Sequence, residues 1–167
     1  MRWLRHLFAR SAASRFPPAS LQRIAAAIAA GEQRHTGQVV FAVEPALGLA
    51  ALRRGRDARH RAEQLFARLR VWDTQHNNGV LIYLLLADHR IEVVADRAAS
   101  GPGFDLRWTS LCEHLAQRLQ AGAFEAAGIE AVNEAAAILA EFFPRDVDAA
   151  RSNELPDHPI LLDASPD

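Results

Sequence analysis

The chain has 167 residues, half of them hydrophobic and 23% charged, which is the composition of one globular domain. Its formal net charge of −1 excludes the strongly basic class of nucleic-acid-binding proteins. Every one of its 19 Lys or Arg residues is Arg, which excludes lysine chemistry, and its single cysteine, Cys112, excludes an intramolecular disulfide.

Residues 1–15 form a short basic amphipathic segment. They carry four Arg and no acid, with Trp3, Leu4, Leu7 and Phe8 between the charges. Two interpretations stay open: the segment rests on an anionic membrane surface, or it is an ordinary terminal helix packed on the domain. The longest apolar run in the chain has eight residues, whereas a membrane-spanning helix needs about 20. Arg5 interrupts the apolar part of the N-terminus, which therefore lacks the apolar region of about 7–15 residues of a secretory signal. Without such a signal, and with a single cysteine, we expect a cytoplasmic protein, peripheral at the inner membrane if the first interpretation holds.

The next part of the chain predicts a helix, a strand and a second helix. The first helix begins at Pro17–Ser20, since Pro and Ser suit a first turn, and it ends near Gly31. Residues 38–44 (QVVFAVE) are rich in β-formers and predict a strand. Residues 46–56 predict a loop, after which Asp57 is the expected N-cap of an arginine-rich helix.

Two further strands are predicted in the middle of the chain. Residues 79–87 are continuously apolar, which is typical of a strand covered on both faces. The two-residue gap Asp88–His89 then predicts a tight hairpin, so the strand over residues 90–95 is expected to be antiparallel to its predecessor.

Two long helices and an acidic tail complete the prediction. Asp105 is the expected cap of a helix whose apolar stripe includes Cys112. A second helix runs from Phe124 to Phe143 and stops at Pro144. Residues 145–167 form an acidic, proline-containing tail, in which three apolar residues can dock on the domain. These are Ile160, Leu161 and Leu162.

The order α-β-α-β-β-α-α predicts an α/β fold. The first two strands flank a helix, which implies a right-handed parallel crossover, and the hairpin adds an antiparallel strand. We therefore expect a three-layer α/β/α sandwich with a small mixed sheet. The expected organisation is a basic N-terminal segment (1–15), one α/β domain (16–144) and an acidic tail (145–167).

Polar residues gather at one end of the predicted sheet. The loop before the second strand and the loop after the third must meet there, because a hairpin brings its start and finish together. Two carboxylates in these loops, Asp73 and Asp96, are candidate ligands for Ca²⁺ or Mg²⁺, which prefer oxygen. The alternative is that they cap turns. The accompanying candidate ligand-loop residues are Thr36, Asn77, Asn78 and Arg97.

Other candidate sites have weaker support. Cys112 and Arg118 match the Cys-x5-Arg spacing of cysteine phosphatases, but Cys112 lies in the middle of a predicted helix and is expected to be a core residue. Glu44, Asp88 and His89 collect at the opposite end of the sheet and are weaker candidates than the loop end. Catalytic residues remain unassigned.

Several segments in the same order resemble the TPM domain. Val71–Thr74, Asn78–Tyr83 and Ala87–Arg97 are similar to its central block, and Thr36–Val40 is similar to its first strand. Gly122–Ala126 resembles the segment before its last helix. The similarity covers about residues 20–143 and implies an α/β/α sandwich. Family members include a plant thylakoid-lumen protein with acid phosphatase activity, a photosystem-repair factor and a receptor regulator.

The resemblance departs from the family pattern at the candidate site. Trp72–Gln75 stands where many members have Trp-Gly-Ile-Gly, and Ala95–Asp96 stands where many have glycines. These substitutions add carboxylates to the candidate end, and the phosphatase site of the plant member does not carry over. The tail segment Asn153–Pro159 is similar to that of a bacterial subgroup without membrane spans.

Two function hypotheses follow from the sequence. The first is an accessory binding module whose partner is an anionic membrane surface or a membrane-associated protein, with no role in nucleic-acid binding. The second is a divalent-cation-dependent phosphatase acting on phosphomonoesters. In it Asp73 and Asp96 hold the metal, and Arg97 or Arg107 holds the phosphate. The oligomeric state is not predicted.

Overall fold

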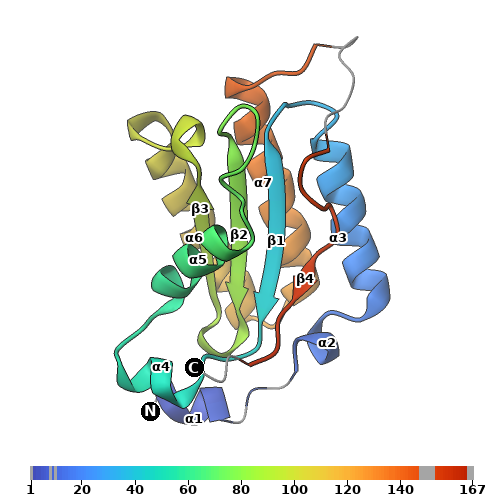
Figure 1. Cartoon of the computed structure of the whole chain (residues 1–167). Coiled ribbons are helices and arrows are strands. Elements are labelled where there is room, and N and C mark those ends of the chain that lie inside the picture. The colour runs from blue at the N-terminus through green and yellow to red at the C-terminus, as the bar shows by residue number, and fades with distance from the viewer. Residues whose placement is uncertain (1, 8, 10, 147–152, 165–167) are drawn as a thin grey trace.

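A computed structural model describes residues 2–7, 9, 11–146 and 153–164. Its centre is a four-stranded sheet in the order β3-β2-β1-β4 (Figure 1). The strands are β1 (Gln38–Glu44), β2 (Gly79–Leu85), β3 (Arg90–Ala95) and β4 (Ile160–Leu161). β1 is parallel to β2 and β4, and β2 is antiparallel to β3, so the predicted mixed sheet is confirmed.

Helices cover both faces of this sheet (Figure 1). One face packs against α3 (Pro18–Gly31), α6 (Pro102–Gln120) and α7 (Phe124–Phe142). The other packs against the shorter α4 (Leu49–Arg53) and α5 (Ala58–Arg68). The expected α/β sandwich is therefore confirmed. Two short helices, α1 (Arg2–Leu7) and α2 (Ala12–Arg15), precede α3.

The apolar composition of β1 and β2 follows from this layering. Every residue of both strands is buried, since each strand contributes alternate side chains to two cores. In β1, Phe41 and Val43 join the core under α3, α6 and α7, whereas Val40 and Ala42 join the core under α5. β3 lies at the sheet edge and exposes Arg90.

Three local expectations were wrong. The strand expected over 79–87 ends at Leu85. The hairpin connection is therefore longer than the expected two residues: it consists of a 3₁₀ turn over Leu86–Asp88 and of His89, which adopts a left-handed conformation (φ 49°). The helix expected to start at Asp105 starts at Pro102 instead, and the Asp105 carboxylate accepts a hydrogen bond from the Gly101 amide at 3.0 Å. α4 also forms within the expected loop.

The acidic tail contributes the fourth strand. The Leu162 amide donates to the Val43 carbonyl at 2.8 Å, which extends the pairing of β4 with β1. At the start of β1, Oε1 of Gln38 accepts the amides of Glu154 and Leu155 at 2.9 and 3.1 Å. The expected docking through residues 160–162 is thus observed, in the form of strand pairing. No helix in the described part of the chain has the length and apolarity needed to cross a membrane.

Candidate functional site

The two loops of the predicted site meet at one end of the sheet, as expected. The Asp96 amide donates to the Gly79 carbonyl at 2.9 Å, and the Ala98 amide donates to the Asn77 carbonyl at 3.0 Å. Asn77 adopts a left-handed conformation (φ 52°), which asparagine tolerates better than most residues. These bonds place the loop that enters β2 against the loop that leaves β3.

The two candidate carboxylates have different partners. The exposed Asp73 side chain pairs with Arg70, three residues earlier, at 2.5 Å. Oδ1 of Asp96 accepts the Arg97 amide at 2.7 Å and so caps the following 3₁₀ turn. The Arg97 guanidinium donates to Oδ1 of Asn77 at 2.9 Å. Asp96, Arg97 and Asn77 therefore form one connected group, whereas Asp73 pairs locally.

Two side-chain oxygens at this end have no hydrogen-bond donor. Nδ2 of buried Asn78 donates to Oγ1 of Thr36 at 3.3 Å, but Oδ1 of Asn78 has no partner among the described residues. Oδ2 of Asp96 is likewise buried and unpartnered. Since buried polar atoms are usually satisfied, these two oxygens have free capacity to accept a donor or a cation. Nε2 of buried His35, next to Thr36, also has no partner among the described residues.

A close backbone approach fixes the shape of this end. A Cβ atom built on Gly79 would lie 2.0 Å from the Val71 carbonyl oxygen. Only glycine fits at the start of β2, because any larger residue would push Val71 and the loop that follows away from the sheet.

The opposite end of the sheet holds a buried ion pair. Glu44, at the end of β1, is fully buried, and Arg61 of α5 donates to both its carboxylate oxygens at 2.9 and 3.0 Å. The Tyr83 hydroxyl from β2 also donates to Oε2 of Glu44 at 2.7 Å. Burial, followed by the nearby Glu44 carboxylate, raises the pKa of Tyr83 well above its usual range, so the phenol stays protonated.

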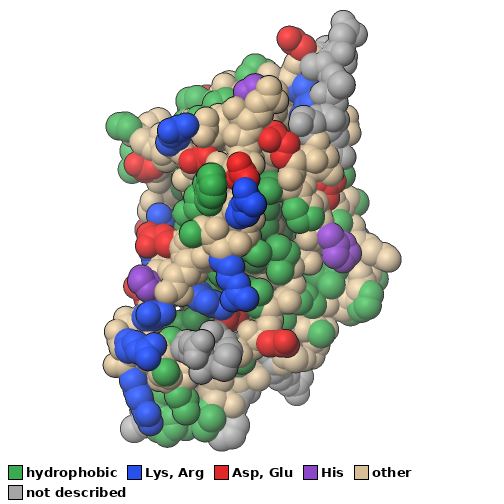
Figure 2. All heavy atoms as spheres, viewed as in Figure 1, with side chains coloured by type: hydrophobic (Ala, Val, Ile, Leu, Met, Phe, Trp, Pro, Cys, Tyr) green, Lys and Arg blue, Asp and Glu red, His purple; other side chains and the backbone are tan. Residues whose placement is uncertain are grey.

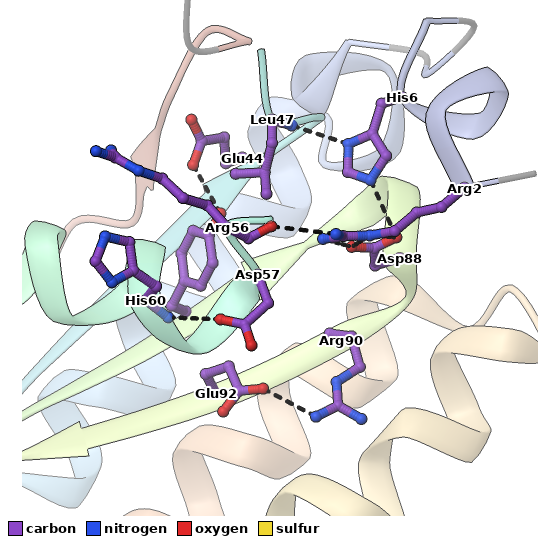
Figure 3. A network of polar contacts seen from close by, with 11 residues as sticks. Arg2, His6, Glu44, Leu47, Arg56, Asp57, His60, Asp88, Arg90 and Glu92 are labelled. Carbon is purple, nitrogen blue, oxygen red and sulfur yellow. Dashed lines mark hydrogen bonds and ion pairs between the residues drawn. The ribbon is translucent and has the colours of Figure 1, made fainter. Parts of the chain in front are cut away.

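Asp88 anchors α1 at the same end (Figure 3). Nε and Nη2 of Arg2 donate to the Asp88 carboxylate at 2.9 and 2.7 Å. Nε2 of His6 lies 3.0 Å from Oδ1 of Asp88, and the Leu47 amide donates to Nδ1 of His6 at 3.0 Å. Although burial opposes it, the hydrogen bonds from His6 and Arg2 leave the pKa of Asp88 well below its usual range.

The contacts of His6 define its chemical role. Since the Leu47 amide donates to Nδ1, that nitrogen is unprotonated, and Nε2 carries the proton donated to Asp88. Both ring nitrogens are therefore occupied, and neither is free to take a proton from a substrate. The pair of His6 and Asp88 is an anchor for α1, not a general base.

Cys112 is not an activated thiol. It lies partly buried on α6 and packs against the larger core. Burial is the main cause that raises its pKa to about 12, so it is protonated at neutral pH. The expectation that it is a core residue is consistent with this environment.

Sequence reasoning did not identify the partners of Glu44 and Asp88. The partners of these acids are distant in sequence: Arg61 lies 17 residues from Glu44, and His6 lies 82 residues from Asp88. One signal was present. An acid at the end of an otherwise apolar strand, as in QVVFAVE, needs a buried counter-charge, and the arginine-rich helix after Asp57 is the nearest supply.

A mixed four-stranded sheet between helical layers, with polar loops at one end, defines a class of α/β sandwich proteins. The family model described as the TPM domain matches residues 11–138, and the chain belongs to this family. A similar solved structure is the NMR structure of the BA42 protein from the psychrophilic bacterium Bizionia argentinensis sp. nov.. The two share 23% identity with a TM-score of 0.70, over 85% of this chain and 92% of that chain, which supports the fold. No curated protein matches.

Proposed function

We propose that this TPM domain is a non-catalytic accessory module that binds peripherally to an anionic membrane surface through α1 and α4. One observation carries the proposal. α1 is fixed to the domain through Arg2 and His6, yet its apolar side chains Trp3, Leu4 and Leu7 point outward. Trp3 is 49% exposed and Leu7 is 54% exposed. An anchored helix with an outward apolar face suits the boundary between headgroups and acyl chains.

Basic side chains surround this apolar face. Arg5 of α1 is exposed, as are Leu49 and Arg53 of α4 and the C-cap residue Arg54 that follows them. Arg2 of α1 also donates to the carbonyl of Arg56, in the loop that follows α4, at 3.1 Å. Figure 2 shows the basic side chains along the lower left of the molecule, where Figure 1 places α4 and α1. Each such Arg adds about 1 kcal/mol of attraction to an anionic surface. Phe8, also expected on this face, lies outside the described residues.

The contacts of the buried histidine and the thiol support a non-catalytic role. Both nitrogens of His6 are occupied, and Cys112 is protonated at neutral pH. In the described ranges, no Ser, Thr or Cys side chain is hydrogen-bonded to a histidine, so the nucleophile–base pair of a covalent hydrolase is not assembled there.

Vesicle co-sedimentation tests the proposal. The full chain should pellet with phosphatidylcholine vesicles that contain phosphatidylglycerol, and much less with phosphatidylcholine alone or in high salt. Trp3→Ala/Leu7→Ala should abolish pelleting. The matched control is Trp72→Ala/Leu106→Ala, because Trp72 is 47% exposed and Leu106 is 79% exposed, both outside α1 and α4. Equal binding by both double variants, with folding confirmed by circular dichroism, would refute the proposal.

A separate pair of variants tests how much the exposed arginines contribute to vesicle binding. Arg53→Gln/Arg54→Gln removes two exposed positive charges from α4 and should weaken binding to anionic vesicles about 25-fold, at about 1 kcal/mol per charge. The Arg107→Gln variant changes an arginine that pairs with Glu141 on the α6–α7 side of the molecule, and it should bind like the unmodified chain.

The unpartnered oxygens favour a second candidate function. Oδ1 of Asn78 and Oδ2 of Asp96 are unpartnered oxygens at the loop end, and oxygen ligands suit Ca²⁺ or Mg²⁺. In this hypothesis Asp96 and Asp73 hold the cation, and a phosphomonoester is hydrolysed beside it. Turnover of p-nitrophenyl phosphate that requires Mg²⁺ or Ca²⁺ and is lost in folded Asp96→Ala would support it. Absence of both turnover and thermal stabilisation by either ion would exclude it.

A further inference from the structure

Three ligand-type side chains meet on the outer surface between α6 and α7. His114 projects from α6, and Glu130 and Glu134 project from α7. One ligand atom from each residue can be chosen so that the three atoms all lie within 4.8 Å of one another. The Glu134 carboxylate oxygen Oε1 lies 3.2 Å from Nδ1 of His114, and Oε1 of Glu130 lies 3.9 Å from Nε2.

We propose that this cluster, His114, Glu130 and Glu134, binds a late first-row divalent metal ion such as Zn²⁺. Imidazole nitrogen together with carboxylate oxygen is a ligand set that zinc uses, whereas Ca²⁺ and Mg²⁺ prefer oxygen alone. With ligand bonds of about 2.0–2.2 Å, a tetrahedral zinc ion separates its ligand atoms by about 3.4 Å. The 3.2 Å distance between His114 and Glu134 is already close to that separation.

The helix geometry makes the remaining adjustment small. Glu130 and Glu134 are four residues apart, so they share one face of α7 and lie one turn from each other. His114 reaches that face from the packed neighbour α6. Glu134 faces Nδ1 of His114 and Glu130 faces Nε2, so Glu130 has to turn toward the Nδ1 side to reach the same ion. All three side chains are partly exposed, at 47, 28 and 37% for His114, Glu130 and Glu134, which leaves room for this turn.

A fourth residue orients one ligand without blocking it. Nε of Arg118, one turn after His114 on α6, pairs with Oε2 of Glu130 at 2.5 Å. Oε1 of Glu130 is left for the ion, and Arg118, which is 47% exposed, can follow Glu130 as that side chain turns. Outer-sphere partners of this kind fix the orientation of metal-ligating carboxylates. The charges also fit: two carboxylates and one guanidinium leave the site at −1 with neutral His114, and a divalent cation offsets that charge.

This site is distinct from the loop end. It contains neither Asp73 nor Asp96, and it is formed by a different pair of elements and a different ligand chemistry. Three protein ligands leave one coordination position for water or for a group from a partner.

Isothermal titration calorimetry of the full chain with ZnSO₄ tests the proposal. One equivalent should bind, and His114→Gln should lose this binding because the nitrogen ligand is removed. The matched control is His60→Gln, which changes an exposed histidine on α5. Saturating Zn²⁺ should raise the melting temperature of the unmodified chain by about 5 °C and leave that of His114→Gln unchanged.

Two further measurements separate a built site from general surface binding. Glu134→Gln should weaken Zn²⁺ binding, and Arg118→Gln should weaken it about tenfold through loss of orientation. Co²⁺ as a probe should produce the visible absorption of a four-coordinate ion in the unmodified chain but not in His114→Gln. Equal Zn²⁺ affinity of the His114→Gln and His60→Gln variants, or no binding to the unmodified chain, would overturn the proposal.

Discussion

The two ends of the sheet satisfy their polar side chains in different ways. At the loop end, Asp96 and Asn77 make single hydrogen bonds near solvent, and two buried oxygens have no donor. At the opposite end, Glu44 and Asp88 each receive a two-nitrogen arginine contact and a further hydrogen bond. The first arrangement leaves capacity for a ligand. The second uses its acids to join α5 and α1 to the sheet.

The largest loss of stability should follow from breaking the buried ion pair between Arg61 and Glu44. Arg61→Ala leaves Glu44 charged and uncompensated, so the free energy of unfolding should fall by about 3–5 kcal/mol. Arg107 makes a similar two-nitrogen contact with Glu141 in an exposed position, where water screens the charges, so Arg107→Ala should destabilise the protein much less. Urea denaturation measures both. Equal losses of stability in the two variants would contradict the expectation that the buried pair matters more than the exposed one.

At the loop end, the largest effect should come from Gly79. The Gly79→Ala substitution places a Cβ atom against the Val71 carbonyl oxygen and should destabilise the protein by about 3 kcal/mol. Gly103→Ala in the first turn of α6 is the control, because its Cβ would make only ordinary contact with Phe142, at 3.8 Å. Chemical denaturation should show Gly103→Ala to be neutral or slightly stabilising; a tolerated Gly79→Ala would contradict the close approach.

As the pH falls, protonation of His35 should be the first event that lowers the stability of the fold. Its side chain is buried beside the loop end, and burial lowers its pKa from 6.5 to about 4. The unfolded chain therefore binds this proton more readily, and stability decreases as the pH falls from about 6.5 to about 4, by about 3 kcal/mol in total. Comparing unfolding at neutral pH and near pH 4.5 measures this slope. His35→Gln should flatten it, and an unchanged slope would contradict the assignment.

The smallest loss of stability should follow from replacing Asp88. Its pKa is lowered in the folded state, so its contribution to stability is present above the usual carboxyl pKa of 3.8 and is lost as the pH falls below that value. At neutral pH, Asp88→Asn should cost about 2 kcal/mol and should increase amide hydrogen exchange in α1. Unchanged exchange in α1 would show that Asp88 does not hold this helix.

Local sequence signals predicted the central elements well. The apolar runs at β1 and β2 and the N-cap Asp57 are short-range features; Oδ1 of Asp57 accepts the His60 amide at 2.9 Å. β4 was not predicted as a strand because Ile160–Leu161 is only two residues long and follows two prolines, so no periodicity marks it. The strand forms because the edge of β1 supplies hydrogen-bond partners and a core.

The candidate site was predicted only in outline. The hairpin rule placed Asp96, Asn77 and Asn78 at one end of the sheet, and the structure brings their loops together. The pairing of Arg97 with Asn77 could not be read from spacing, because the two residues are 20 positions apart and meet only when the loops have folded. Arg70 and Asp73, by contrast, are close in sequence. Whether the carboxylates bind a cation stays a prediction.

Trp3 fluorescence tests the central claim most directly. The Trp72→Phe variant leaves exposed Trp3 and buried Trp108, so any change in emission on adding vesicles reports on α1. The account predicts a blue shift and protection from an aqueous quencher with phosphatidylglycerol vesicles, reversed by high salt. Unchanged emission and unchanged quenching, at vesicle concentrations that pellet the protein, would contradict membrane contact through α1.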